Sequence, residues 1–295
     1  MPMIFVLSAT ISWLLTSFLI PFLKGGFMDN PNHRSSHIHA TPRGGGIAFV
    51  LVGTLFNFLY ETGPSRWIPV ACLPLACVGL VDDFRELPAT LRYVVQLVTA
   101  IVLVGIVDRS MPLWLSLVSV LLITAIINFT NFMDGLDGLV AGCGVLLMAS
   151  TSSWAISGAI FGFLIWNWAP AKVFMGDVGS TYIGALFGGM LIHRSPDHDM
   201  FSILLIGFPL LADAFICVIR RFVSGENIFK AHRKHLFQRL QQAGWSHQKV
   251  ATFYISAVAV LLLSYTIAGF TVLIISVLIE FFIAFYLERY VAAKF

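Results

Sequence analysis

Long apolar stretches recur along almost the whole chain, and only short polar segments separate them. Backbone N–H and C=O groups in lipid must form their hydrogen bonds within the segment itself, so each stretch is expected to be a helix. Several stretches are shorter than the roughly 20 residues that cross the hydrocarbon layer. We predict an all-α polytopic membrane protein with about 11 transmembrane helices, forming a single integral-membrane domain over residues 1–295. The stretches are residues 2–23, 45–60, 67–81, 91–107, 112–129, 138–153, 155–170, 181–193, 201–219, 250–268 and 270–287.

The composition supports lipid as the solvent for most of the chain. Hydrophobic residues make up 58% and charged residues 11%, whereas a soluble domain is about half apolar and a quarter charged. These values exclude a soluble globular enzyme, a disordered regulator and a disulfide scaffold. The four cysteines lie in apolar runs without CxxC spacing, so we interpret them as small packing residues. They are Cys72, Cys77, Cys143 and Cys217.

The basic residues fall on one side of the membrane when the loops are assigned alternately. Lys and Arg accumulate in cytoplasmic loops. With the N-terminus outside, all but three of the 18 Lys and Arg residues lie inside, the exceptions being Arg66, Arg109 and Arg194. The first stretch precedes Lys24 and has no basic residue before it, which predicts a retained helix and not a signal peptide. We therefore expect the C-terminus in the cytoplasm.

The same alternation collects the unusual polar residues on the inner face. They occur in residues 24–44, 82–90, 130–137, 171–180 and 220–249. One elaborate face is more typical of an enzyme than of a transporter, which needs a path to both sides. The chain also lacks the two corresponding halves that many transporters show.

Two adjacent carboxylates, Asp82 and Asp83, end the third stretch. Neighbouring carboxylates repel each other unless a cation lies between them. Mg²⁺ is usually held by one or two carboxylates together with substrate phosphates, so the pair suggests part of a magnesium-phosphate site. The alternative is a solvated loop boundary.

Carbonyl-bearing side chains recur every third residue at the end of the fifth stretch, as Asn128, Asn131 and Asp134. Neighbours in this series lie close together on a helix, and Gly135 and Gly138 then allow a tight turn. The run can bind a planar or phosphorylated ligand. A helix end with polar caps would explain only part of this pattern.

Asp177 stands between Gly176 and Gly179 at the head of the eighth stretch. It can supply a metal ligand next to a helix N-terminus that favours phosphate. It can also simply cap that helix. The other acidic motifs on the same face favour the first interpretation.

Two inner segments are basic. Arg34 and Arg43 flank histidines and precede three glycines, so this loop can grip an anion or merely follow the positive-inside rule. On a helix, His232, His235 and Arg239 would share one face and could clamp a diphosphate or rest on anionic lipid headgroups. A zinc site at the histidines of the first segment is disfavoured, because no Cys or HExxH run accompanies them.

Three polar side chains lie inside apolar stretches, namely Gln96, Asp213 and Glu280. Burying them in lipid is expensive, so each is expected to have a partner or a role. The sequence does not indicate which.

The order and content of these inner segments resemble the polyprenyl-phosphate N-acetylhexosamine-1-phosphate transferases, of the glycosyltransferase family 4 type. The resemblance covers residues from about Asp29 to His247 and is strongest to the branch that initiates O-antigen synthesis. It implies Mg²⁺-dependent transfer of a sugar 1-phosphate from a UDP-N-acetyl sugar to undecaprenyl phosphate, with release of UMP. It also implies a catalytic domain in the bacterial inner membrane, with the N-terminus periplasmic and the active site cytoplasmic. Mn²⁺ is an alternative metal, a homodimer is compatible with the sequence, and no nucleic acid partner is expected.

The resemblance also assigns roles to single residues. Asp82, Asp83, His232 and His235 match catalytic positions, and Asn131 and Asp177, with Asp82, match metal-binding positions. The histidine motif usually reads HxHH but here reads HRKH, with Lys234 at the third position. The residues predicted to bind substrate are Asn128, Asp134, Gly135, Leu136, Asp137, Arg34, Arg43, Arg92, Lys234 and Arg239.

Phosphoryl transfer needs alignment and charge neutralisation more than covalent help. A phosphomonoester with a second pKa near ~6 is already mostly dianionic at neutral pH. Direct attack of the lipid phosphate on the donor is therefore our first expectation, and an aspartyl-phosphate intermediate at Asp82 or Asp83 is the alternative. The rival functions are an intramembrane prenyltransferase and a transporter of an anionic solute.

Overall fold

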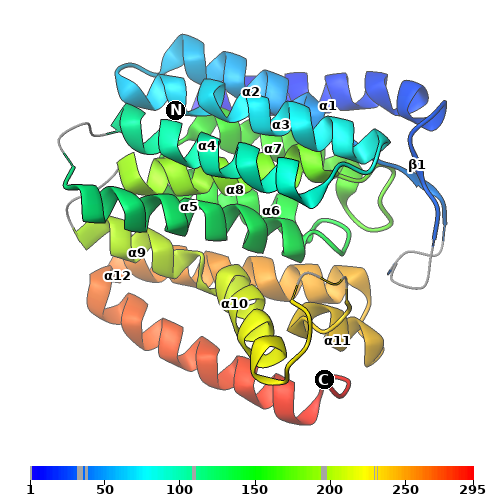
Figure 1. Cartoon of the computed structure of the whole chain (residues 1–295), viewed down its shortest axis with the longest axis vertical. Coiled ribbons are helices and arrows are strands. Elements are labelled where there is room, and N and C mark those ends of the chain that lie inside the picture. Colours follow the sequence, from blue (N-terminus) through cyan, green and yellow to red (C-terminus); the bar gives the residue numbers. More distant parts are fainter. Residues whose placement is uncertain are drawn as a thin grey trace.

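The protein is an all-α polytopic membrane protein whose helices lie side by side in one bundle (Figure 1). The computed structural model describes residues 2–31, 36, 39–107, 111–193, 198–228, 230 and 232–295. The elements in chain order are α1 (Pro2–Lys24), β1 (Met28–Asp29), β2 (Thr41–Pro42), α2 (Ile47–Tyr60), the 3₁₀ helix η1 (Pro64–Trp67), α3 (Ile68–Phe84), α4 (Ala89–Val107), α5 (Leu113–Met133), α6 (Leu139–Ser150), α7 (Trp154–Asn167), α8 (Asp177–His193), α9 (His198–Ile206), α10 (Phe208–Val223), α11 (Leu236–Gln242) and α12 (His247–Tyr290).

Helix α8 is the centre of the bundle. All of its residues from Val178 to Ile192 are buried, as expected for a helix that is apolar on every side. It packs against α3, α4 and α5. The first residue of α8 is Asp177, so the helix that is most enclosed by protein begins at one of the predicted metal ligands.

Every predicted apolar stretch lies on helical structure, but the helices differ in length. Within the described residues, five helical segments are long and apolar enough to span a membrane: α1, η1 with α3, α4, α5 and α12. Helices α9 and α10 are bent by 74° at Gly207 and would together make a sixth. Helices α2, α6 and α7 are apolar but shorter. The count of eleven spans and the direction of insertion therefore stay predictions.

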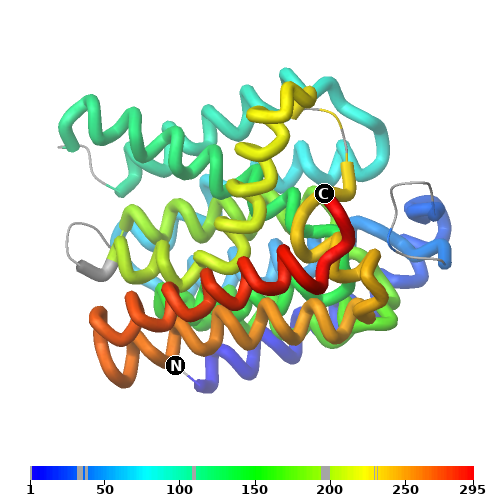
Figure 2. The backbone as a smooth tube through the Cα atoms, turned by 90° about the horizontal axis from the view of Figure 1, so that it is seen from below, coloured from blue at the N-terminus to red at the C-terminus, as the bar shows by residue number. Residues whose placement is uncertain are grey.

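Helix α12 is a hairpin of two antiparallel arms. The chain turns at Gly269, where φ is 79° and ψ is −171°, a conformation that glycine adopts without steric cost. The hydroxyls of Ser264 and Ser276 then meet across the two arms at 2.8 Å. Figure 2 shows the first arm running away from the C-terminal end and the second arm returning to it. The predicted break between residues 268 and 270 is confirmed.

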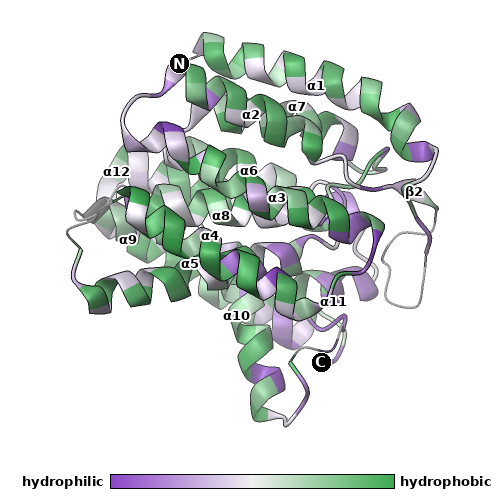
Figure 3. Ribbon diagram, turned by 45° about the horizontal axis from the view of Figure 1, so that its top comes forward, coloured by the Kyte–Doolittle hydropathy of each residue, from purple (hydrophilic) through white to green (hydrophobic). Residues whose placement is uncertain are grey.

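The hydrophilic residues gather at one end of the bundle, beside β2 and α11, while the helices themselves are largely hydrophobic (Figure 3). At this end, β1 and β2 form a short antiparallel pair. Phe174 donates its main-chain N–H to Pro42 at 2.7 Å, and Gly45 and Gly46 donate to Phe174 and Met175 at 3.0 and 2.9 Å. These bonds fasten the loop before α2 to the loop before α8, and this holds Arg43 over the ends of the helices.

Candidate active site

A pocket of about 310 Å³ opens at the C-terminal ends of α3 and α5, beside the N-terminal end of α8. We call it the acidic pocket, because its described lining holds five carboxylates and a single arginine. Such an excess of negative charge would repel a phosphorylated ligand unless cations accompany it. The charged and titratable residues that line it are Asp29, Asp83, Asp134, Asp137, Asp177, Arg43, His232 and His247.

Asp83 anchors the N-terminus of α8. Its Oδ1 accepts the main-chain N–H of Asp177 at 3.0 Å, and its Oδ2 accepts that of Val178 at 3.2 Å. Arg43 lies 3.2 Å from Oδ1 of the same carboxylate. The first N–H groups of a helix have no partner within the helix, so Asp83 caps α8 from outside. The cap of α8 is therefore the side chain of Asp83 and not that of Asp177, which was the alternative prediction.

Asp82 and Asp177 are joined by one guanidinium group. Arg92, from the first turn of α4, lies 2.8 Å from Oδ2 of Asp82 and 3.5 Å from Oδ2 of Asp177. The other oxygen of Asp82 accepts the N–H of Leu87 at 2.7 Å. Arg92 is 40% exposed, so a phosphate arriving from outside the bundle can reach it. The exposed guanidinium of Arg92 thus lies directly beside two of the predicted metal ligands.

Asn131 orients Asp177 from the side of α5. Its amide nitrogen donates to Oδ1 of Asp177 at 3.0 Å and to the hydroxyl of Ser180 at 2.9 Å. The amide oxygen of Asn131 and the oxygens of Asp82 and Asp177 are hard ligands of the kind that Mg²⁺ prefers. The predicted metal-binding set is thus brought together from three different helices.

The loop after α5 supplies two further carboxylates. Burial, and then the nearby Asp177, Asp83 and Asp137, raise the pKa of Asp134 to about 8. The three neighbouring carboxylates add to the effect of burial, so a cation placed among them would lower the cost of ionising Asp134. The donor set and its charge therefore fit a divalent cation.

Asp137 connects this loop to two other segments. Its Oδ2 accepts the N–H of Ala171 at 3.1 Å, and its Oδ1 lies 3.3 Å from Nδ1 of His247. The other ring nitrogen of His247 is 3.1 Å from the main-chain oxygen of Ser36. His247 is a site residue that the sequence interpretation did not select. Only its position within the basic segment 220–249 indicated that it could belong to the site.

The prediction that His232, His235 and Arg239 share one helical face is wrong. Helix α11 begins at Leu236, so both histidines precede it in an extended loop. The Asp213 carboxylate accepts the N–H groups of Leu236 and Phe237 at 2.8 and 3.1 Å. These bonds fix the start of α11 and stop the helix from extending back to the histidines.

The two histidines have different environments. Burial, and then the charge of His235, lower the pKa of His232 to about 4, so its ring is neutral at pH 7. Burial also acts to lower the pKa of His235, but Asp213 outweighs it and raises that pKa to about 9. His232 lines the acidic pocket, whereas His235 lies behind it against Asp213, at 3.7 Å.

Three of the predicted substrate-binding residues lie away from the acidic pocket. Asn128 donates to Gln96 of α4 at 2.8 Å, which also gives Gln96 its partner. Lys234 forms an ion pair with Glu226. Arg239 is 3% exposed and binds Glu288 and the main-chain oxygen of Ala293, each at 2.6 Å.

Lys234 and Arg239 instead line a second, mostly apolar cavity of about 840 Å³ between α10 and both arms of α12. Glu280 also lines it, and its carboxylate oxygens are buried with no hydrogen-bond partner among the described residues. Arg34 lies outside the described residues. The other predicted site residues, Gly135 and Leu136, line the acidic pocket.

Comparison with known proteins identifies the family of the chain. The family described as "Glycosyl transferase family 4" matches residues 66–195. A Bacillus subtilis (strain 168) protein named "Probable undecaprenyl-phosphate N-acetylglucosaminyl 1-phosphate transferase" is 30% identical to this chain. The match covers 83% of this chain and 80% of the length of that protein. A Thermotoga maritima "Undecaprenyl-phosphate alpha-N-acetylglucosaminyl 1-phosphate transferase" is also 30% identical. That match covers 78% of this chain and 80% of the length of the relative.

A more distant type of relative is also similar. A "Phospho-N-acetylmuramoyl-pentapeptide-transferase" from Synechococcus is 29% identical over 85% of this chain and 87% of its own length. The resemblance drawn from the inner segments is thereby confirmed over most of the chain. The chain is an enzyme that belongs to the polyprenyl-phosphate hexosamine-1-phosphate transferases of glycosyl transferase family 4.

Proposed function

We propose that the enzyme transfers an N-acetylhexosamine 1-phosphate from a UDP-sugar to undecaprenyl phosphate or a similar polyprenyl phosphate, and releases UMP, with Mg²⁺ as cofactor. The observation that carries the proposal is the convergence of Asp83, Asp134, Asp137 and Asp177 in one pocket at the end of an apolar bundle. A water-soluble nucleotide and the phosphate of a membrane-bound lipid can meet at such a place.

The charges of the pocket suggest how the two substrates are held. Asp82, Asp177 and Asn131 hold Mg²⁺, or Mn²⁺ in its place, and the metal supplies charge neutralisation for the donor diphosphate. The loop from Asp134 to Asp137 receives the nucleotide. Arg92 is exposed beside the metal ligands and binds the lipid phosphate.

Direct transfer is the step that this arrangement favours. An oxygen of the lipid phosphate attacks the β-phosphorus of the donor, and the bond between that phosphorus and the bridging oxygen breaks. UMP leaves with the bridging oxygen, and the sugar phosphate stays on the lipid as a diphosphate. An aspartyl-phosphate at Asp83 is disfavoured because its oxygens already accept from Asp177, Val178 and Arg43.

We further propose that the acidic pocket faces the cytoplasm of a bacterial inner membrane and that the product starts an envelope glycan, O-antigen being our first candidate. The distribution of Lys and Arg supports this orientation. The N-terminus lies near the left of the bundle in Figure 1, away from β1 and the polar end, which agrees with a periplasmic N-terminus.

Product analysis tests the proposal. The purified protein is incubated with undecaprenyl phosphate, Mg²⁺ and a panel of UDP-N-acetyl sugars, beginning with UDP-N-acetylglucosamine, and with a chelator control. We expect UMP and a lipid-linked sugar diphosphate, both lost with the chelator. Release of UDP would mean that the glycosidic bond is cleaved instead. Release of UMP that is indifferent to the chelator would contradict the magnesium assignment.

A further inference from the structure

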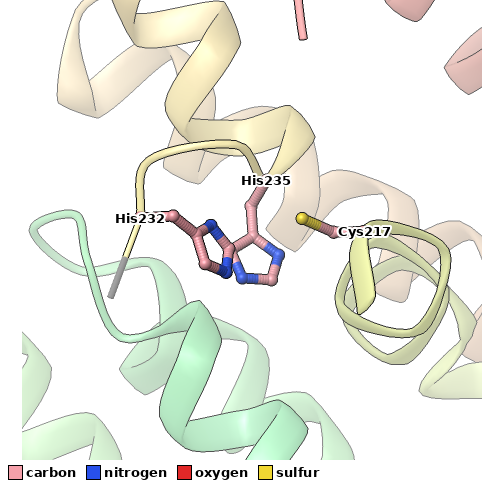
Figure 4. Close-up of side chains that lie close together, drawn as sticks. All are labelled: Cys217, His232 and His235. Carbon is pink, nitrogen blue, oxygen red and sulfur yellow. The ribbon is translucent and has the colours of Figure 1, made fainter. Parts of the chain in front are cut away.

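Three metal-ligating side chains meet behind the acidic pocket, on the side of α10. Cys217 projects from α10, and His232 and His235 come from the loop before α11, so that all three point toward one another (Figure 4). One ligand atom from each can be chosen so that all three atoms lie within 4.8 Å of one another. This set is distinct from the carboxylates and the amide that are assigned to Mg²⁺.

Each side chain offers a sulfur or nitrogen atom as a ligand, and His235 does so once it has lost a proton. Nδ1 of His232 accepts the N–H of Lys234 at 3.2 Å, so its other ring nitrogen is the free one. His235 is 3% exposed, and its Nδ1 has no hydrogen-bond partner among the described residues. A buried polar atom without a partner is costly, and a metal ion would relieve that cost. Cys217 is also 3% exposed.

We propose that Cys217, His232 and His235 form a site for a soft transition-metal ion, with Zn²⁺ as the expected ion. Thiolate and imidazole are the ligands that zinc takes in proteins, whereas Mg²⁺ takes oxygen. Three protein ligands leave a fourth position open, as in zinc sites that also bind water or a substrate. His232 lines the acidic pocket, so the open position is reached from there.

The surroundings of the cluster suit a metal. Asp213 lies 3.7 Å from Nδ1 of His235 and is itself held by Tyr254 at 2.7 Å and by the start of α11. A carboxylate this close to the cluster would offset the positive charge of the ion. Binding displaces a proton from Cys217 and another from His235, so affinity is expected to fall as the pH falls.

The test uses the full-length protein, stripped of metal and titrated with Co²⁺. We expect one equivalent to bind with a thiolate-to-cobalt charge-transfer band, which Zn²⁺ bleaches and excess Mg²⁺ does not. Cys217→Ser should lose the band and weaken Zn²⁺ binding by at least about tenfold. Cys143→Ser is the matched control, because Cys143 is another buried thiol and lies on α6 outside the cluster.

X-ray absorption of the zinc-loaded wild type provides a second measurement that needs no variant. It should show one sulfur at about 2.3 Å and two imidazole nitrogens at about 2.0–2.1 Å. A spectrum with only oxygen or nitrogen ligands would overturn the proposal, as would equal Zn²⁺ affinity in Cys217→Ser and wild type. In that case His235 would serve only as the ion-pair partner of Asp213.

Discussion

The Oδ1 atom of Asp83 accepts the main-chain N–H of Asp177 at 3.0 Å. The second aspartate of the adjacent pair therefore holds the first residue of α8, while the first aspartate, Asp82, shares Arg92 with the side chain of Asp177. The two neighbours thus act on the same residue in different ways. Asp83 fixes the backbone of Asp177, and Asp82 sets the charge around its carboxylate.

Asp177→Asn should abolish the transfer without unfolding the protein. The amide keeps the shape of the side chain but removes a negative ligand, so kcat should fall at least ~10²-fold, as it does when one preorganised electrostatic group is lost. Release of UMP measures the effect. Glu280→Gln is the control, because Glu280 lines the α10–α12 cavity and not the acidic pocket. Full activity in Asp177→Asn would show that the metal assignment is wrong.

Gly176→Ala should disrupt the cap on α8. Gly176 has φ of +74°, and an added Cβ would lie 2.8 Å from Cγ of Asp83. The variant should lose about 1–3 kcal/mol through backbone strain and, in addition, most of its activity. Gly225→Ala is the matched control, since Gly225 has φ of +70° but open space around its added Cβ.

Thermal unfolding and UMP release are measured on both glycine variants. Both variants should show the effect of backbone strain, whereas only Gly176→Ala should also displace the side chain of Asp83. Equal losses of activity in the two variants would mean that the contact with Asp83 has no special importance. We expect Gly225→Ala to lose stability and keep its activity.

Arg92→Lys should impair use of the lipid more than use of the nucleotide. A lysine keeps the charge but lacks the planar group that reaches both Asp82 and Asp177. Losing a hydrogen bond to a charged group costs about 1.5–3 kcal/mol, so the KM for the lipid phosphate should rise roughly tenfold or more. Steady-state kinetics with each substrate varied in turn provide the measurement. A rise confined to the KM of the UDP-sugar would assign Arg92 to the donor instead.

The stability of the metal-free protein should depend on Asp134. Its pKa is raised from 3.8 to about 8, so the folded state binds a proton that the unfolded chain has already released. The contribution of Asp134 to stability is therefore fully present below pH 3.8, declines as the pH rises from there, and is lost above about 8. Thermal unfolding in chelator between pH 6 and 9 should show this decline in the wild type and a shallower one in Asp134→Asn. Parallel profiles would contradict the prediction.

Arg239→Gln should affect stability and not substrate binding. The guanidinium of Arg239 is buried and binds Glu288 and the oxygen of Ala293, which closes the C-terminal segment onto α11. The variant should lose about 1.5–3 kcal/mol of stability and keep both KM values within about twofold. Denaturant unfolding and kinetics measure the two effects. Raised KM values at unchanged stability would restore the prediction that Arg239 binds substrate.

Much of the fold follows from the sequence. Each apolar stretch forms helical structure, and the break before residue 270 is the turn at Gly269. The acidic motifs that the sequence assigned to one face do meet in one pocket. These features are local, because lipid requires each segment to satisfy its own backbone and helix ends fall where polar residues begin.

The precise partners of the site residues could not be predicted. Nothing in the order of residues indicates that Asp83 caps α8 or that His247 meets Asp137. The short helix α11 begins four residues later than His232 because Asp213, from another helix, binds its first N–H groups. That contact separates the histidines from Arg239.

The sequence by itself therefore determined which segments form apolar helices and which polar residues gather at one end of them. Tertiary structure alone decided which side chains face the acidic pocket and which, like Lys234 and Arg239, turn to the cavity between α10 and α12. The physical reason is the distance along the chain over which each kind of interaction acts. Hydropathy and helix ends depend on neighbouring residues, whereas the direction of a charged side chain depends on the nearest opposite charge, which packing brings from a distant part of the chain.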